Sequence, residues 1–388
     1  MRLPLVFALS FAASIFVCAT SCVAQTYTVE EALEWTSFFD TTSGWTGADG
    51  IFSFPVDGNE RPGGVNRTDT IFVFSDTFIG NVNPDKSRSQ ASLVNNTLGF
   101  LQQGSFSSGA KYFWDQSGAT PAAMVVPNTP QSQAGDWYWF ADGVVIGNQL
   151  HVLAQRMHTL PGGGGAFGFE RGGMALISMP TTGPFVSSSI TQVDAPVGLP
   201  PVQGGRGGIF FGAGIFPNTA AAGAPNPDGF VYIYGSQEDP LVKKLVVARV
   251  QAQDFTDFAA WRYWDGANWV RDIRQVRTVT GRISNELSVT PTPHGQYALI
   301  FSLDTLSNQV AMKLADHPWG PFGPAEVLWH IVPPPGLDDI FTYNAKAHPH
   351  LSEPGELLIS WNVNTFNFWD HFTYADIYRP RFIKLVWQ

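Results

Sequence analysis

The sequence predicts an all-β protein, and three observations support this fold class. Glycine (39 residues) and proline (28 residues), which interrupt regular helices, are both frequent in the 388-residue chain. Helical periodicity is hard to find beyond a short turn expected at residues 29–35. Short runs of aromatic and β-branched residues recur instead, separated by turn dipeptides. We therefore expect a strand-rich fold built from antiparallel sheets.

The first predicted sheet covers residues 44–114. It opens with a hairpin, in which residues 51–54 and 70–77 are joined across a turn rich in proline and glycine. Asp49 precedes the first of these strands, and Asp76 ends the second. Two further strands are expected at residues 91–100 and 111–114. One such unit is ordinary, so its meaning depends on whether the chain repeats it.

Four more units repeat this layout of a first strand, a turn and a return strand. Asp142 stands at the head of the second unit, glycines (Gly212 and Gly214) take this place in the third, Glu286 in the fourth and His348 in the fifth. The expected strands are, in order, 144–146 and 150–155; 212–216, 230–235 and 244–250; 284–289, 297–301 and 309–314; and 344–350, 357–361 and 379–387.

Five units at spacings of roughly 60 to 95 residues predict a five-bladed β-propeller of four-stranded antiparallel blades around a central channel. We found no linker-like change in composition that would favour a β-sandwich followed by a second domain. Residues 25–388 are therefore expected to form one domain. The long spacing also requires long loops, for which residues 162–165, 200–208 and 333–337 are candidates.

The N-terminal segment has the layout of a secretory signal peptide, because Arg2 is followed by an apolar run over residues 3–17. We expect cleavage after Ala24 and a secreted or periplasmic protein, although Cys18 or Cys22 could instead carry the lipid anchor of a bacterial lipoprotein. Both cysteines of the chain lie in this segment, so a mature domain would have no disulfide. No later apolar run is long enough to span a membrane.

Composition limits the kinds of partner. The net charge is −10 with only 22 Lys and Arg residues, which excludes a basic surface for nucleic acid. Charged residues make up 14% and aromatic residues another 14%, including 13 Trp. Such a composition suits strand-rich cores and also suits surfaces that stack on the apolar faces of sugars. We expect a monomer that binds a polysaccharide or oligosaccharide.

The heads of the first strands identify the candidate site. In a propeller the innermost strands line the channel, so Asp49, Asp142, Glu286 and His348 would converge at one rim. Converging carboxyl groups are what hydrolysis of a glycosidic bond needs, one as acid and one as base or nucleophile. The Asp-Gly pairs could equally be simple turns. Glu286 heads an apolar strand, where an unpaired carboxylate would be costly.

Other chemistries lack their motifs. The chain has no His-Glu-x-x-His or EF-hand spacing, so no metal site is predicted, although Ca²⁺ held by scattered oxygens, structural or on the axis, stays open. No Gly-x-Ser-x-Gly nucleophile elbow is present. The glycines at 162–165 lack the Lys and Ser/Thr of a phosphate-binding loop.

Several segments resemble a known group of exported bacterial domains. They are residues 44–50, 74–78, 137–143, 284–288 and 347–352, and they are similar to the families called DUF4185 and DUF5005. Some members of this group are similar to five-bladed propeller glycoside hydrolases, including endo-acting arabinanases. The resemblance implies a carbohydrate-active propeller with its acids at Asp49, Asp142 and Glu286. The glutamate falls on the fourth repeat here, whereas those enzymes usually place it on the third.

Our leading hypothesis is a secreted glycoside hydrolase. Glu286 would be the general acid, Asp49 the base or nucleophile, and Asp142 would orient the acid or tune its pKa. Substrate contacts are expected from the remaining candidates, which are Trp45, Asp76, Trp137, Trp139, Asn344 and His348. The alternatives are a non-catalytic propeller that binds carbohydrate at the same rim and a scaffold that binds protein.

Overall fold

A computed structural model describes residues 26–162, 168–332, 337 and 339–388. These residues are mainly strands, with the short α-helices α1 (Leu33–Phe38) and α2 (Asp370–Thr373), which confirms the all-β prediction. The predicted signal peptide and most of the predicted loops at 162–165 and 333–337 lie outside the described residues. Within the described ranges, every helix is too short or too polar to cross a bilayer.

The first part of the chain forms two antiparallel sheets, where the sequence predicted one. One sheet has the order β3-β4-β7-β8, with β3 (Phe52–Pro55), β4 (Thr70–Phe74), β7 (Thr97–Leu101) and β8 (Lys111–Phe113). The other has the order β2-β5-β6, with β2 (Ser43–Ala48), β5 (Thr77–Val82) and β6 (Arg88–Val94).

The predicted strand over residues 91–100 is in fact the end of β6 and most of β7, because Asn95 and Asn96 interrupt the strand. The Asn96 side chain donates to the carbonyls of Val125 and Tyr138, at 2.9 and 3.1 Å. It also accepts a hydrogen bond from the backbone N–H of Val125. Asn96 therefore connects the link between β6 and β7 to the neighbouring sheet by hydrogen bonds and does not continue a strand.

Three sheets follow the next predicted repeats, with longer strands than expected. The first contains β9 (Trp137–Ile146), β10 (Gln149–Thr159), β11 (Phe169–Pro180) and β12 (Thr191–Ala195). The second contains β13 (Gly198–Leu199), β14 (Gly208–Pro217), β15 (Phe230–Asp239), β16 (Val242–Gln251), β17 (Arg262–Trp264) and β18 (Trp269–Val270), with β19 (Thr280–Gly281) paired to β16. The third contains β20 (Leu287–Pro291), β21 (Tyr297–Ser302), β22 (Gln309–Ala315) and β23 (Glu326–His330).

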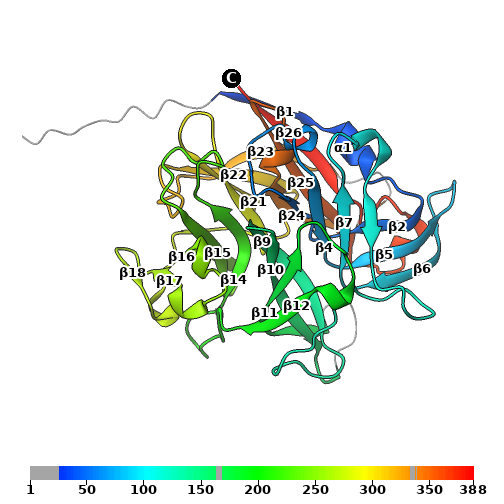
Figure 1. Cartoon of the computed structure of the whole chain (residues 1–388), viewed down its shortest axis with the longest axis horizontal. Coiled ribbons are helices and arrows are strands. Elements are labelled where there is room, and N and C mark those ends of the chain that lie inside the picture. The colour runs from blue at the N-terminus through cyan, green and yellow to red at the C-terminus, as the bar shows by residue number, and fades with distance from the viewer. Residues whose placement is uncertain (1–25, 163–167, 333–336, 338) are drawn as a thin grey trace, which may run out of the picture.

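The last sheet joins the two ends of the described chain. Its order is β1-β26-β25-β24, with β1 (Tyr27–Glu31), β26 (Arg381–Trp387), β25 (Glu356–Thr365) and β24 (Ile340–Ala347). Tyr27 lies opposite Trp387 in the antiparallel pairing of β1 with β26. Figure 1 shows these two strands side by side next to the C-terminus. The turn expected at residues 29–35 is therefore partly this closing strand and partly α1.

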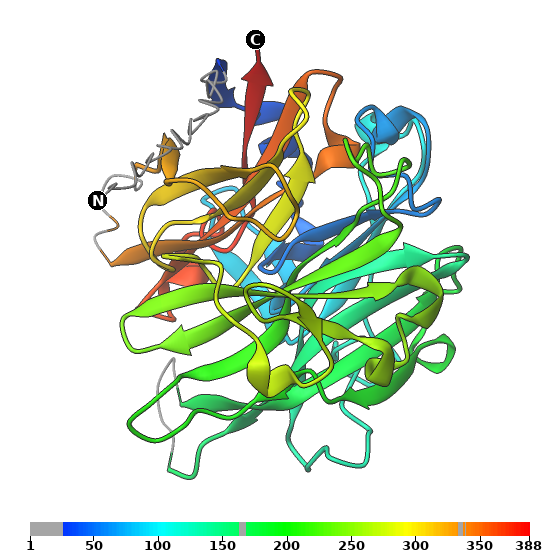
Figure 2. The ribbon, with the colours of Figure 1, turned by 90° about the vertical axis from the view of Figure 1, so that its left-hand side faces the viewer.

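The sheets are arranged as a propeller-like ring, and a hydrophobic cluster lies between each sheet and the next. Phe54 and Ile71 of the first four-stranded sheet pack with Val152 of the β9–β12 sheet. Phe72 packs in a cluster with Leu358 and Phe382 of the last sheet, which closes the ring. Figure 2 shows the sheets from the side. Burying each of these side chains contributes about 1.5–3 kcal/mol, so the ring is held mainly by contacts between sheets.

Three of the first strands contain bulges. Residues 141–142 of β9 oppose one residue of β10, residues 212–213 of β14 are unmatched in β15, and residues 344–345 of β24 oppose one residue of β25. Bulges bend a strand and redirect its side chains, and they are common beside active sites. Asp142, predicted to precede a strand, lies at the bulge inside β9.

Candidate functional site

Asp49 and Asp76 are held side by side by their backbones. Asp49 lies between β2 and β3, and Asp76 lies between β4 and β5. The Asp49 N–H donates to the Asp76 carbonyl at 3.1 Å, and the Asp49 carbonyl accepts from the Ser75 N–H at 3.0 Å. Gly50 has φ 58°, and a Cβ there would lie 2.6 Å from Ser75 Oγ. The Asp49-Gly50 pair is thus a tight link that glycine alone fits, and it fixes Asp49 beside Asp76.

The two oxygens of the Asp49 carboxyl group have different surroundings. Oδ2 accepts hydrogen bonds from the hydroxyls of Tyr343 (2.8 Å) and Tyr378 (2.9 Å). Oδ1 is buried, and no hydrogen-bond partner for it is found among the described residues. Burial raises the pKa of Asp49 well above its usual value, and the charges of Asp76 and Glu286 raise it further. Oδ1 is therefore the atom left for a proton, a water or a substrate.

Asp76 is held by neutral donors. Its Oδ1 accepts from Trp139 Nε1 at 2.7 Å and from Asn95 Nδ2 at 3.1 Å. Burial nevertheless raises the pKa of Asp76 to about 6, against the effect of these two hydrogen bonds. Trp139 packs edge-on against Phe169 at 4.8 Å, with Trp137 beside it at 6.1 Å. Both tryptophans are half-buried. Trp139 holds Asp76 by its hydrogen bond, and Trp137 packs beside Trp139.

Glu286 is paired with a cation. It directly precedes β20, and its carboxylate forms an ion pair with Lys346 Nζ of β24, whose side chain is only 2% exposed. The same ammonium lies 4.1 Å from the centre of the Phe52 ring. Burial raises the pKa of Glu286, and the Lys346 charge works in the opposite direction. Lys346 was missed in the sequence, where its only signal is a lysine within an apolar run after Asn344.

Asp142 lies apart from this group. Its carboxylate accepts from the backbone N–H of Gly143 (2.8 Å) and of Ile215 (2.6 Å), which joins β9 to β14. Burial raises the pKa of Asp142 to about 8; the two backbone hydrogen bonds lower it, the Glu60 charge raises it and the Lys346 charge lowers it. Asp142 is thus connected with Glu286 through the charge of Lys346, not through Asp49.

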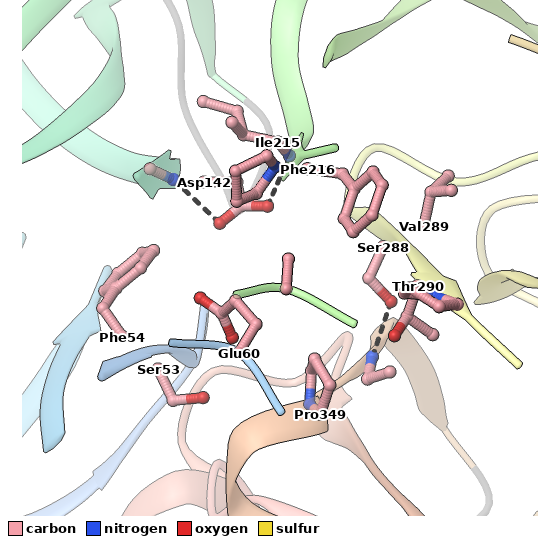
Figure 3. Close-up of a pocket in the computed structure, with 15 residues that line it drawn as sticks. Ser53, Phe54, Glu60, Asp142, Ile215, Phe216, Ser288, Val289, Thr290 and Pro349 are labelled. Atoms are coloured by element: carbon pink, nitrogen blue, oxygen red, sulfur yellow. Dashed lines mark hydrogen bonds between the residues drawn. The ribbon is translucent and has the colours of Figure 1, made fainter. Parts of the chain in front are cut away.

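Figure 3 shows Asp142 and Glu60 bordering one cavity, together with Ser53 and Ser288. The cavity encloses about 460 Å³, part of which is open to solvent. Its walls come from five of the sheets, through Ser53, Phe54, Glu60, Asp142, Gly143, Ile215, Phe216, Pro217, Ala222, Ser288, Val289, Thr290, Pro291, Ala347 and Pro349. Asp49, Asp76 and Glu286 are not among these residues, so Asp142 is the one predicted catalytic acid that borders the cavity.

Two predicted substrate contacts are buried in the protein instead. Trp45 is 1% exposed and stacks on Tyr112 with ring centres 4.7 Å apart. It points into the hydrophobic cluster beneath β2, so it does not line a sugar-binding surface. His348 is also 1% exposed, and its Nδ1 and Nε2 are hydrogen-bonded to Ser53 (2.7 Å) and Ser360 (2.8 Å). Burial lowers the pKa of His348 well below its usual value, which makes it a neutral structural residue.

Asn344, the other candidate on β24, is buried in the bulge and has φ 60°. This left-handed conformation is uncommon for a residue other than glycine and tends to occur at functional sites. Asn344 follows Tyr343, which contacts Asp49, and comes two residues before Lys346, which contacts Glu286. The bulge in β24 therefore lies between Tyr343, which contacts Asp49, and Lys346, which contacts Glu286.

Exposed aromatic side chains border this region and were not predicted. After β25, Phe368 is 42% exposed, Trp369 71% and Tyr374 43%. His371, from the same segment, packs on Tyr378 at 5.1 Å, and Tyr378 in turn contacts Asp49. The signal was a run of aromatic residues outside any predicted strand. Exposed aromatic rings thus lie in the segment that packs on Tyr378.

The described residues contain no group of three or more His, Cys, Asp and Glu side chains that could hold a metal ion. Lys346 supplies a positive charge among the acids. Ca²⁺ held by scattered oxygens, which the sequence left open, stays an open alternative.

A sequence model of a domain of unknown function, DUF5005, matches residues 32–387. The chain belongs to the DUF5005 family. This confirms the DUF5005 resemblance that the motifs indicated. A search of curated proteins finds no significant match to this DUF5005 protein.

One solved structure shares its fold. A candidate hydrolase from Bacteroides ovatus ATCC 8483 superposes with a TM-score of 0.70 at 21% identity, over 94% of this chain and 92% of that one. A GH62 α-L-arabinofuranosidase domain from Coprinopsis cinerea gives 0.45 at 8% identity, over 94% and 97%. A GH43_1 enzyme from Xanthomonas citri, complexed with xylotriose, gives 0.44 at 11% identity, over 92% and 93%. The last two TM-scores are too low to support a conclusion, so only the first shows a shared fold.

Proposed function

We propose that this DUF5005 protein is a secreted or periplasmic glycoside hydrolase that cleaves a polysaccharide or oligosaccharide. The observation that carries the proposal is the meeting of Asp49, Asp76 and Glu286, which come from three separate segments: the charges of Asp76 and Glu286 both raise the pKa of Asp49. Hydrolysis of a glycosidic bond needs one carboxyl group that holds a proton and another that is ionised. Carboxyl groups whose surroundings separate their pKa values in this way mark acid and base roles.

The surroundings of the acids also fit a neutral sugar. Asp49 Oδ1 has no hydrogen-bond partner among the residues described, so its hydrogen-bonding capacity is unused. Trp139, Phe368 and Trp369 offer apolar ring faces close to the acids or to the residues that hold them. Aromatic faces combined with a few polar groups are typical of sites for uncharged polar ligands.

We also propose that the ring has five blades, each centred on one of the strands β3, β9, β14, β20 and β24. The three-stranded β2-β5-β6 sheet would then be an addition to the first blade. Support comes from the hydrophobic clusters, which pair each of these sheets with the next and the last with the first. The fold shared with the Bacteroides ovatus candidate hydrolase is in keeping with this assignment.

The proposed reaction centre is the group formed by Asp49 and Glu286, with Asp76 as the neighbour of Asp49. Asp142 keeps a proposed role in tuning the site, because the charge of Lys346 acts on both Asp142 and Glu286. Trp137 and Trp139 keep their proposed place near the substrate.

The test is a screen of residues 25–388 against a panel of polysaccharides, with detection of new reducing ends. Asp49→Asn and Glu286→Gln should each lower the rate by at least about 100-fold, the usual loss when a general acid or base is removed. Glu353→Gln, which changes an exposed carboxyl group in a turn, is the control and should keep full activity. Glycan binding with no product over long incubation would replace the proposal with a non-catalytic carbohydrate-binding protein.

A further inference from the structure

Resting on the proposed function, we infer that the Asp49–Asp76 pair holds the catalytic proton and that Glu286 works as the ionised group. This reverses the roles expected from the sequence, in which Glu286 was the acid. It also gives Asp76 and Lys346 roles that the sequence did not suggest. Asp76 places a negative charge beside Asp49, and Lys346 places a positive charge beside Glu286.

The first support is the ion pair of Glu286. Lys346 Nζ contacts the Glu286 carboxylate, and both side chains are at most 10% exposed. A cation next to a buried carboxyl group favours its ionised form. The other titratable groups that interact with this pair are Asp49, whose pKa the Glu286 charge raises, Asp142, whose pKa the Lys346 charge lowers, and His348, which is neutral. Lys346 therefore has Glu286 as its direct counter-ion.

The second support is that the Asp49–Asp76 pair has no such cation. The side-chain partners of the two acids are the hydroxyls of Tyr343 and Tyr378, the indole of Trp139 and the amide of Asn95. All four are neutral donors, and in the described part of the chain neither acid makes a salt bridge. The direct backbone pairing of the two residues keeps their carboxyl groups close. Two close carboxylates without a cation cannot both ionise easily, so the pair retains one proton.

The third support places that proton on a particular atom. The two tyrosine hydroxyls donate to Asp49 Oδ2, so Oδ2 serves as the acceptor oxygen of the carboxyl group and a proton would sit on Oδ1. Asp49 Oδ1 is buried and lacks a partner among the residues that the structure describes. A proton on Oδ1 turns this unpaired acceptor into a donor. Asp76, held by Trp139 and Asn95, keeps the negative charge of the pair.

In the reaction, the Asp49 proton passes to the glycosidic oxygen while the bond from that oxygen to the anomeric carbon breaks. A water molecule forms the new bond to the anomeric carbon, and Glu286 takes its proton. Glu286 then releases this proton to solvent, and the Asp49–Asp76 pair takes one up, so that one water has been added across the bond. Lys346 is a positioning residue, because it acts by keeping Glu286 ionised.

The proton can be located without a substrate, by infrared spectroscopy of the carbonyl band of protonated carboxylic acids at pH 7. Asp49→Asn and Asp76→Asn should each remove one such band from the spectrum, because either change destroys the shared proton. Lys346→Met should add a band that disappears again in Lys346→Met/Glu286→Gln. Asp142→Asn is the matched control: it should remove a different band, because the pKa of Asp142 is about 8.

Loss of a band in Glu286→Gln alone, with none lost in Asp49→Asn, would overturn the inference. The glycan screen tests the proposed function separately: an inactive wild type with the expected bands refutes the hydrolase proposal but not the proton location. With an active wild type, Asp76→Asn should lower the rate by about 100-fold or more and move the acidic limb of the pH profile. Full activity of Asp76→Asn would contradict its role.

Discussion

Lys346→Met removes the cation from a buried ion pair while keeping a side chain of similar length over the Phe52 ring. The variant leaves the Glu286 carboxyl group buried without its counter-ion. Breaking a buried pair in this way typically costs about 3–5 kcal/mol of unfolding free energy. Glu286 can avoid part of this cost by taking up a proton, so the loss must depend on pH.

The sign follows from the two states of Glu286. Without Lys346, burial raises its folded-state pKa above the value of about 4.3 for an unfolded chain. Near pH 4 the carboxyl group is neutral in both states, and the variant loses little. As the pH rises above this value, ionisation of Glu286 stabilises the unfolded state by about 1.4 kcal/mol per pH unit. This continues until Glu286 also ionises in the folded state. At pH 7.5 the loss should therefore approach about 4 kcal/mol.

The assay is urea unfolding followed by tryptophan fluorescence at pH 4.5, 6 and 7.5. Lys346→Met/Glu286→Gln should recover most of the loss, because no buried charge remains. Lys384→Met is the matched control: this lysine of β26 is 25% exposed and pairs with Glu30 and Glu356. Exposed pairs contribute about 0–1 kcal/mol, so the control should change little. A loss that does not vary with pH, or a double variant as unstable as the single one, would refute the reasoning.

Three further predictions concern other parts of the protein. Trp45→Ala should lower the unfolding free energy by about 3–5 kcal/mol, because it empties a buried site, and should leave glycan affinity per folded molecule unchanged. Trp139→Phe removes a hydrogen bond to Asp76 and should raise the Asp76 pKa above about 6, seen by ¹³C NMR titration of the carboxyl groups. Arg88→Met should cost about 3 kcal/mol or more in urea unfolding, because buried Arg88 donates to four backbone carbonyls and packs over Phe78, and leaving those acceptors unpaired is costly.

Much of the strand framework can be predicted because its first strands are apolar, and the turns between them are rich in glycine and proline. The misses have local causes. β5 and β6 interrupt the first unit, and Asn95 and Asn96, which bridge to Asp76 and the neighbouring sheet, were read as part of a strand. β23 carries no alternation strong enough to identify it. β1 could not be found from local pattern, since its partner lies at the other end of the chain.

The site is harder to predict, because side-chain direction depends on bulges. Asp49 and Glu286 can be predicted as site residues because each stands at the head of the first strand of its repeat. In the folded protein the Glu286 charge raises the pKa of Asp49. Asp142 occupies the same place in the repeat, yet the bulge at residues 141–142 ties it to the backbone of β14. Asp76 ends the second strand of its unit, and the other units have no clear equivalent of it. Its closeness to Asp49 arises from a backbone contact that no pattern of residue types reveals.

The pairing of β1 with β26 also affects how the chain reaches its native state. The residues that meet there, Tyr27 and Trp387, are almost the whole chain apart. Bringing them together costs roughly 5 kcal/mol in loop-closure entropy for a flexible chain of this length. Until β1 docks, β26 presents an open edge to other molecules, and open edges promote aggregation. We therefore expect the docking of β1 to be a late and slow step of folding, because its partner β26 lies at the far end of the described chain.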